Sequence, residues 1–242
     1  GEANETFTYD AKGQLTSAPN ANAPVLLPYA PVDRLTSERL NGKVTSYQYN
    51  TPGRTKVVSY PNGKLFTETF DLRGRLVSVV DNATQEVLTT YAFDEGNRKV
   101  GQSNLNGTSS TIAYDDNSNV IGVGHLLSGS TKEWEYGHNN NDNNIFERNL
   151  HRPTRSRQFV YDDYNRLLEF KRGTLNGAVI NAPNKSVAYA YDGANNRTAL
   201  TVDANPTNYT TNNLNQYTAL TGSGAATQSY GANGKLENDG VY

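Results

Sequence analysis

The chain has 242 residues, of which 35% are hydrophobic and 10% aromatic, and its formal net charge is -2. The small net charge gives no broad field of one sign, which argues against partners such as nucleic acid or an acidic membrane surface. The absence of cysteine excludes disulfides and thiolate metal sites, and the 16 tyrosines are atypical of a disordered chain.

The ends and the apolar runs place the chain in a broad class. No apolar run approaches the roughly 18 residues needed to span a bilayer, and residues 1–10 lack the layout of a signal peptide. The sequence contains no methionine, so Gly1 is a translational start only if an initiator was trimmed. We therefore expect a soluble piece of a larger protein, with no membrane insertion.

An aromatic anchor recurs along the chain at intervals of roughly 20 residues. A second aromatic or aliphatic column lies two residues before it, a spacing that puts both columns on one face of a strand. The pattern predicts a single continuous array of about eleven units over residues 1–242. The anchors are Tyr9, Tyr29, Tyr49, Phe70, Phe93, Tyr114, Tyr136, Tyr161, Tyr191 and Tyr230, with Thr211 in one unit.

The residues after each anchor predict a tight turn. An Asp that directly follows the anchor can accept a hydrogen bond from the backbone two residues on. Gly, Asn or Asp four residues after the anchor tolerates a positive φ, which costs other residues about 1–2 kcal/mol. The Asp column includes Asp10, Asp71, Asp94, Asp115, Asp162 and Asp192, and the second column includes Gly13, Gly53, Gly74, Asn140, Asn165 and Gly234.

An arginine and a leucine then begin the return strand in many units. The arginine should form an exposed pair with the Asp, worth about 0–1 kcal/mol. A second turn, often Asn-Gly, lies about halfway between anchors, and no segment shows a sustained helical period. The fold class is therefore all-β, with tandem antiparallel β-hairpin repeats. The arginines are Arg34, Arg54, Arg75, Arg98 and Arg166.

Two segments break the period, near residues 137–158 and 173–186. We expect irregular surface loops there, and specific binding would reside in them. Arginines cluster in the first segment and suggest contacts with phosphate or acidic polysaccharide, although a solvated strand face is the favoured interpretation. These arginines are Arg148, Arg152, Arg155 and Arg157.

Other chemistry-bearing residues have structural interpretations. His125, His138 and His151 invite a metal site, but they fall at different phases of the repeat. The run 139–144 has a single carboxylate, which favours a polar loop over a calcium site. Trp134 falls in the column two before the anchor, so cross-strand packing explains it without a sugar ligand. We expect no catalytic residue, no metal and no cofactor.

The recurring segments carry a family resemblance. FTYDAKGQL at 7–15, TFDLRGRL at 69–76, FVYDDYNRL at 159–167 and YAYDGANNR at 189–197 resemble the YD repeat of Rhs-type proteins. The resemblance implies a spiralling β-sheet that forms a hollow cocoon, which encloses a C-terminal toxin in bacterial Rhs proteins and insecticidal toxin complexes and is displayed on the cell surface in teneurins. The segment at which such shells cleave off their cargo is not found here, so autoproteolysis is not implied.

The expected function is a structural scaffold, namely a wall segment of a secreted or cell-surface shell that encloses or displays a partner or toxin domain. The alternative is an extracellular adhesin or self-assembling element that binds glycans or copies of itself. Expected partners are further repeats, other copies, an enclosed toxin domain or a glycan. The residues assigned to the structural motif are Tyr9, Asp10, Gly13, Tyr49, Gly53, Arg54, Phe70, Asp71, Gly74, Arg75, Phe93, Asp94, Tyr114, Asp115, Tyr161, Asp162, Arg166, Tyr191, Asp192, Tyr230 and Gly234.

Overall fold

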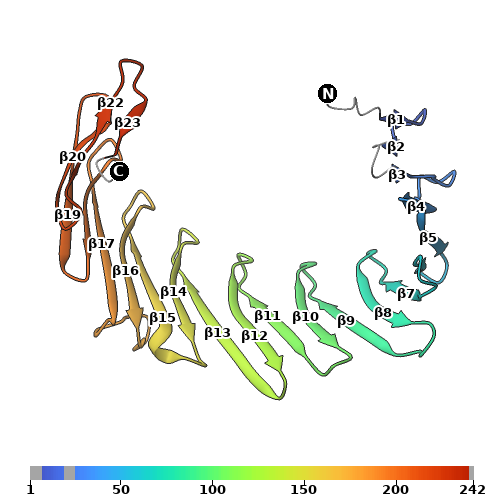
Figure 1. The fold of residues 1–242 in the computed structure, drawn as a ribbon. Helices are drawn as coiled ribbons and strands as arrows, with labels where there is room; N and C mark the ends of the chain where they lie inside the picture. The colour runs from blue at the N-terminus through green and yellow to red at the C-terminus, as the bar shows by residue number, and fades with distance from the viewer. Residues whose placement is uncertain (1–6, 19–24, 240–242) are drawn as a thin grey trace. The chain divides into compact units, whose positions relative to one another are not determined.

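The computed structural model describes residues 7–18 and 25–239 (Figure 1). Within these ranges the regular structure consists of 23 β-strands and one short 3-10 turn, η1 (Pro153–Arg155). Every strand pair is antiparallel and neighbouring in sequence, so the predicted all-β array of tandem hairpins is confirmed. The prediction of one domain over 1–242 includes residues outside the described ranges and stays a prediction.

The chain divides into two compact units, and the first comprises Gly1–Ser110 with Leu126–Gly129. Its strands pair in sequence order from β1 to β10. They are β1 (Thr8–Tyr9), β2 (Leu15–Ala18), β3 (Val25–Leu26), β4 (Ser37–Leu40), β5 (Lys43–Asn50), β6 (Thr55–Ser59), β7 (Leu65–Phe70), β8 (Leu76–Asp81), β9 (Val87–Phe93) and β10 (Lys99–Asn104).

The second unit comprises Thr111–His125 and Ser130–Tyr242. Strands β13 to β21 again pair in sequence order, and β22 with β23 forms a separate two-stranded sheet. The remaining strands are β11 (Ser109–Tyr114), β12 (Val120–Leu127), β13 (Ser130–His138), β14 (Asn144–Asn149), β15 (Ser156–Tyr161), β16 (Leu167–Gly173), β17 (Lys185–Tyr191), β18 (Arg197–Val202), β19 (Asn205–Thr211), β20 (Tyr217–Gly222), β21 (Ala226–Thr227), β22 (Ser229–Tyr230) and β23 (Leu236–Asn238).

In a regular repeat the anchor ends a strand and the chain reverses over the next five residues, as after Phe70 and Tyr161. In the β7–β8 hairpin Phe70 pairs with Leu76, with a register shift just before the turn. Gly74 has a φ of 76°, and Asn165 has a φ of 61° at the same point of the β15–β16 hairpin. Backbones of this kind favour Gly and Asn, which explains the composition of the column.

The turn after Tyr49 differs from the prediction for Gly53. Strand pairing continues through Asn50 and Thr55, so the loop comprises only Thr51 to Arg54. Arg54 has the positive φ, 50°, and Gly53 does not. The one-residue shift arises because the shorter loop moves the left-handed position to the residue that directly precedes the return strand.

The unit assigned to Tyr136 is also out of register. β13 runs on to His138, which pairs with Asn144, and Asp142 has the positive φ of 59°. The anchor position is therefore His138, and the left-handed position is not Asn140. The sequence pattern predicts the anchor at Tyr136, two residues before its position in the structure, because Tyr136 is aromatic and the anchor in this repeat is a histidine.

The irregular segments are smaller than predicted. Residues 139–143 form a regular repeat turn, so the first departure from the repeat lies at 150–155, around η1. The second lies between β16 and β17, where Ile180 is 1% exposed and its N–H donates to Gln158 Oε1 at 2.8 Å. This connection is folded against the sheet rather than being a free surface loop.

The hydrophobic core is thin because most strands of each unit belong to one sheet. Among the described residues, only four hydrophobic side chains are buried: Val58, Leu175, Ile180 and Val187. A core of this size contributes little hydrophobic free energy, since that term scales with the apolar area removed from water. Hydrogen bonds between strands and turns must therefore carry an unusual share of the stability.

The turn geometry predicts a specific cost at Gly74. A Cβ added there would meet no heavy atom within 4 Å, so Gly74→Ala tests backbone conformation alone. We expect it to lower the free energy of unfolding by about 1–2 kcal/mol in urea denaturation. The control Gly193→Ala also has an open Cβ position but no positive φ, and should be neutral or slightly stabilising. Equal effects of the two substitutions would contradict the assignment.

Candidate functional site

The most regular constellation of polar side chains is the row of turns that follows the anchors. In the turn after Phe70, Asp71 Oδ1 accepts the backbone N–H groups of Arg73 at 2.9 Å and Arg75 at 3.0 Å. The Asp71 N–H donates to the carbonyl of Arg75 at 3.0 Å. One carboxylate oxygen thus satisfies two backbone donors that the chain reversal leaves without strand partners.

The second carboxylate oxygen binds the arginine of the same turn. Arg75 Nη2 lies 2.6 Å from Asp71 Oδ2, and the two side chains are only 20% and 23% exposed. Arg166 repeats the contact with Asp162 at 2.6 Å, and Arg98 with Asp94 at 2.7 Å. The sequence predicted an exposed Asp–Arg pair that adds little to stability, whereas the side chains of these pairs are largely shielded from solvent.

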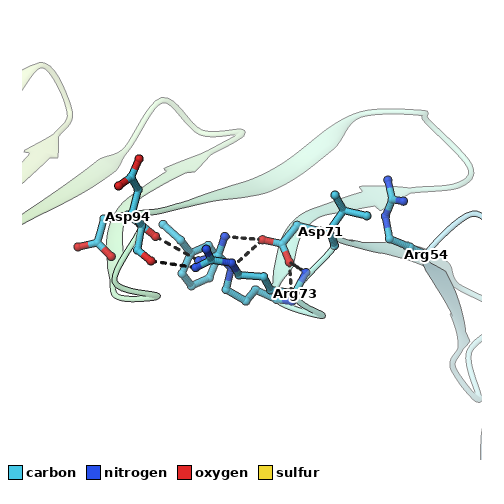
Figure 2. Close-up of a pocket in the computed structure, with 8 residues that line it drawn as sticks. Arg54, Asp71, Arg73 and Asp94 are labelled. Atoms are coloured by element: carbon cyan, nitrogen blue, oxygen red, sulfur yellow. Dashed lines mark hydrogen bonds and ion pairs between the residues drawn. The ribbon is translucent and has the colours of Figure 1, made fainter.

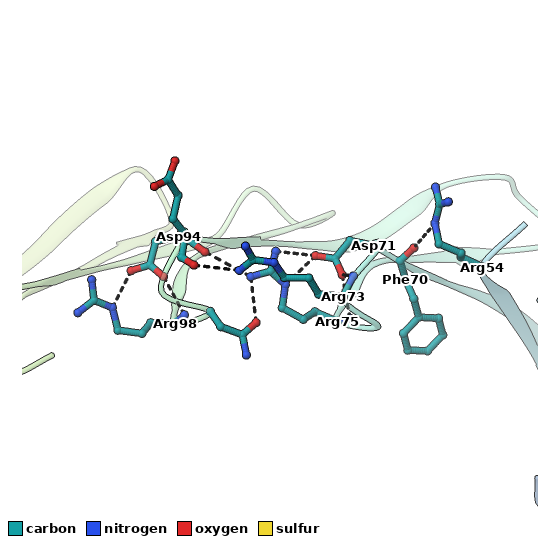
Figure 3. A network of polar contacts seen from close by, with 9 residues as sticks. Arg54, Phe70, Asp71, Arg73, Arg75, Asp94 and Arg98 are labelled. Carbon is teal, nitrogen blue, oxygen red and sulfur yellow. Dashed lines mark hydrogen bonds and ion pairs between the residues drawn. The ribbon is translucent and has the colours of Figure 1, made fainter.

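Arg75 (Figure 3) and Arg166 are covered because each of them also reaches the next turn of the array. Arg75 Nη1 donates to Asn97 Oδ1 at 3.1 Å and to the carbonyl of Asp94 at 3.3 Å. In the second unit, Arg166 Nη1 donates to Asn195 Oδ1 at 2.8 Å and to the carbonyl of Asp192 at 3.1 Å. The arginine is therefore a link between consecutive repeats, a role that its position in sequence did not reveal.

Where the arginine is replaced, an amide makes the same link. Asn119 donates to Asp142 Oδ1 at 2.8 Å, and Asn196 donates to Asn215 Oδ1 at 3.0 Å. Asn143 likewise donates to Asn165 Oδ1 at 2.7 Å. An Asn or Asp at the left-handed position therefore has two uses, since it tolerates positive φ and supplies the acceptor. Glycine at that position has no side-chain acceptor and offers only its carbonyl, as Gly234 does to Gln216 Nε2 at 3.3 Å.

The anchor tyrosines form a second set of hydrogen bonds between neighbouring repeats. The hydroxyl of Tyr191 donates to the carbonyl of Leu167 at 3.0 Å, and that of Tyr49 to the carbonyl of Leu35 at 3.0 Å. The guanidinium of Arg166 lies 4.8 Å from the centroid of the Tyr191 ring. Such cation–π contacts contribute about 0.5–1 kcal/mol at exposed sites. The aromatic column thus also connects one repeat to the next.

The shallow recesses along this row hold groups that are already paired. Figure 2 shows one recess of about 470 Å³, in which Arg73 and Asp71 of one turn face Asp94 of the next. Arg73 donates to the carbonyl of Glu95 at 2.9 Å, and Asp71 is bound by Arg75. Asp71 is therefore engaged by the backbone and the arginine of its own turn.

The turn hydrogen bonds also shift the acidity of the aspartates. The backbone N–H of Arg75 is the main cause that lowers the pKa of Asp71, and the Arg75 side chain acts in the same direction. The pKa of Asp94 is lowered first by the backbone N–H of Arg98. At Asp192 the side-chain amide of Asn196 is the largest cause of a lowered pKa. The folded state therefore favours the charged form of each carboxylate.

The remaining residues singled out by sequence are dispersed. His125 packs edge-on against Trp134, with ring centroids 6.0 Å apart, and His151 Nδ1 lies 3.3 Å from Lys132 Nζ. Trp134 is four residues before the anchor His138, not two as the alignment placed it. Asn139 accepts the N–H groups of residues 141 and 143, so the run 139–144 opens with a repeat turn.

Two absences hold for residues 7–18 and 25–239. In these ranges no three His, Cys, Asp or Glu side chains lie close enough to hold a metal ion together. The same ranges contain no helix that is long and apolar enough to cross a membrane.

No protein-family model and no curated protein matches the chain in sequence. Its fold, however, is similar to part of the Tc toxin chains. The structure of the Photorhabdus luminescens Tc holotoxin pore matches 96% of this chain with a TM-score of 0.51 at 17% identity. The crystal structure of TcdB2-TccC3 matches 94% at 16% identity with a TM-score of 0.47. The chain spans only 15% of each matched chain, so the likeness concerns the fold alone.

The link made by Arg166 predicts a loss of stability on substitution. Arg166→Leu removes the pair with Asp162 and both bonds to the next turn, and should lower the free energy of unfolding by about 2 kcal/mol. Arg166→Asn should cost less, because Asn makes the same link at positions 119 and 196. As a control, Arg39→Leu changes an exposed arginine of β4 and should fall within about 0.5 kcal/mol of wild type. Urea denaturation gives all three values.

The lowered pKa values predict a dependence of stability on pH. An aspartate with a folded-state pKa below its unfolded value of about 3.9 stabilises the fold above that pH, and the contribution is lost as pH falls through the folded value. Asp71→Asn keeps a turn-forming residue but cannot ionise. We expect its melting temperature to lie below wild type at pH 7 and the gap to narrow below about pH 4. A gap that stays constant would contradict the linkage.

Proposed function

We propose that the chain is a structural scaffold, a wall segment of a larger β-shell that encloses or displays a partner domain. The observation that carries the proposal is the link from turn to turn that recurs within each unit, as in Arg75 to Asn97 and Arg166 to Asn195. These links hold consecutive hairpins side by side at the turn ends of the strands. A wall made of one extended sheet needs such bonds between repeats for its stability, whereas a compact enzyme is stabilised by its hydrophobic core.

Three observations support the scaffold over an enzyme. The repeated carboxylates are bonded within turns, the histidines are dispersed, and the fold is similar to part of a Tc holotoxin chain. We propose accordingly that the segment has no catalytic activity of its own. Its proposed neighbours are further repeats of the same larger protein, and its proposed location is secreted or on the cell surface. An adhesin or filament built from copies of the chain is the competing function.

The test uses the full-length protein that contains this segment. If the segment is a wall, Arg75→Leu combined with Arg166→Leu should weaken it and make the enclosed partner accessible to protease. Wild type and Arg39→Leu should protect the partner equally. Electron micrographs of the full-length protein should then show closed particles. Filaments, or a partner cleaved at the same rate in all variants, would overturn the proposal.

A further inference from the structure

We infer that the two irregular connections of the second unit, around η1 and between β16 and β17, hold a binding site for a tetrahedral oxyanion, such as a phosphate or sulfate group. The site lies where η1, β15, β16 and the residue before β17 meet. It forms a recess of about 320 Å³, within the range of pockets that hold small ligands. The lining residues are Thr154, Arg155, Arg157, Arg172 and Asn184.

Strand pairing places like charges directly opposite one another beside this recess. Arg157 pairs with Arg172, and Arg172 pairs with Lys185, so three cations stand in a row across β15, β16 and β17. Residues opposite each other on one face have Cβ atoms about 4.5–5.5 Å apart, and like charges there destabilise the sheet. The row is unfavourable for the fold by itself, and a bound anion would remove the repulsion.

Among residues 7–18 and 25–239, one carboxylate compensates this row. Glu147 lies opposite Arg157 and its Oε2 is 3.1 Å from Arg157 Nη1. Within the described part of the chain, Arg155, Arg172 and Lys185 form no ion pair with a carboxylate. The recess therefore keeps a net positive charge, unlike the turn row, in which arginines pair with aspartates.

The guanidinium of Arg172 is held in position by its neighbours. Arg172 Nε donates to Asn184 Oδ1 at 2.9 Å, and Asn184 Nδ2 donates to the carbonyl of Thr154 at 2.8 Å. The Asn184 N–H also donates to the carbonyl of Arg172 at 2.8 Å. This bracing leaves the terminal nitrogens of Arg172 for a ligand and lowers the entropic cost of binding.

The shape of the donor set favours a tetrahedral anion. Arg157 and Arg172 approach from the strands, and Arg155 approaches from η1. Three guanidinium groups can serve the three or four oxygens of a phosphate or sulfate group, whereas a carboxylate offers only two oxygens. The sequence grouped Arg155 and Arg157 with Arg148, but Arg148 instead donates to the carbonyl of Gly177 at 2.8 Å.

Isothermal titration calorimetry with inorganic phosphate, inorganic sulfate and heparin tests the site. Wild type should bind with saturation and one site per chain, and Arg172→Gln should bind at least tenfold more weakly. The control Arg39→Gln removes the same charge from exposed β4 and should bind like wild type. Heparin binding much tighter than sulfate would identify a sulfated polysaccharide as the source of the group, and equal binding would identify the free ion.

A thermal measurement separates binding from folding. Without ligand, Arg172→Gln should melt at the same temperature as wild type or higher, because the repulsion with Arg157 and Lys185 is relieved. Phosphate should raise the melting temperature of wild type and Arg39→Gln but not that of Arg172→Gln. The site would be overturned by the absence of saturable binding at millimolar ligand, or by equal binding of the two Gln variants.

Discussion

The structure depends on the contact between the arginine of one turn and the polar groups of the next. Arg75 and Arg166 each neutralise the aspartate of their own turn and then bind the following turn through a side-chain oxygen and a carbonyl. One side chain therefore closes a hairpin and sets its distance from the neighbouring hairpin. The contact supplies part of the stabilisation that a hydrophobic core provides in compact domains.

This constraint explains which substitutions the repeat tolerates at the arginine position. A turn can exchange arginine for asparagine, as at Asn119 and Asn196, because the amide still donates to the next left-handed residue. The acceptor is then the side-chain oxygen of Asp142 or Asn215, whereas Gln216 uses the backbone carbonyl of Gly234, because glycine has no side-chain oxygen. Donor and acceptor columns are thus coupled across consecutive repeats, even though they lie about 20 residues apart.

The sequence predicted the hairpins well because their determinants are local. Aromatic residues two apart define a strand face, and Gly or Asn marks the left-handed residue of each turn, as at Gly74 and Asn165. The failures occurred where the local pattern was ambiguous. The aromatic side chain of Tyr136 predicts an anchor there, although the strand continues to His138. At Gly53 a shorter loop moves the positive φ to Arg54.

The contacts between repeats could not be predicted in the same way. That Arg166 reaches Asn195, or that Arg157 lies opposite Arg172, depends on strand register rather than on neighbouring residues. Sequence proximity instead grouped Arg148 with Arg155 and Arg157, although Arg148 contacts the backbone of Gly177. Clusters of charge in a repeat array therefore need the register before they can be assigned to one site.

The two departures from the repeat are connected to each other, which gives them a structural meaning. Asn184, at the end of the second connection, donates to the carbonyl of Thr154 in η1, and Ile180 of the same connection is buried and donates its N–H to Gln158 Oε1. In the regular turns the aspartates and arginines satisfy one another. At this corner the arginines outnumber the carboxylates, so a ligand has groups to bind that the repeat itself does not occupy.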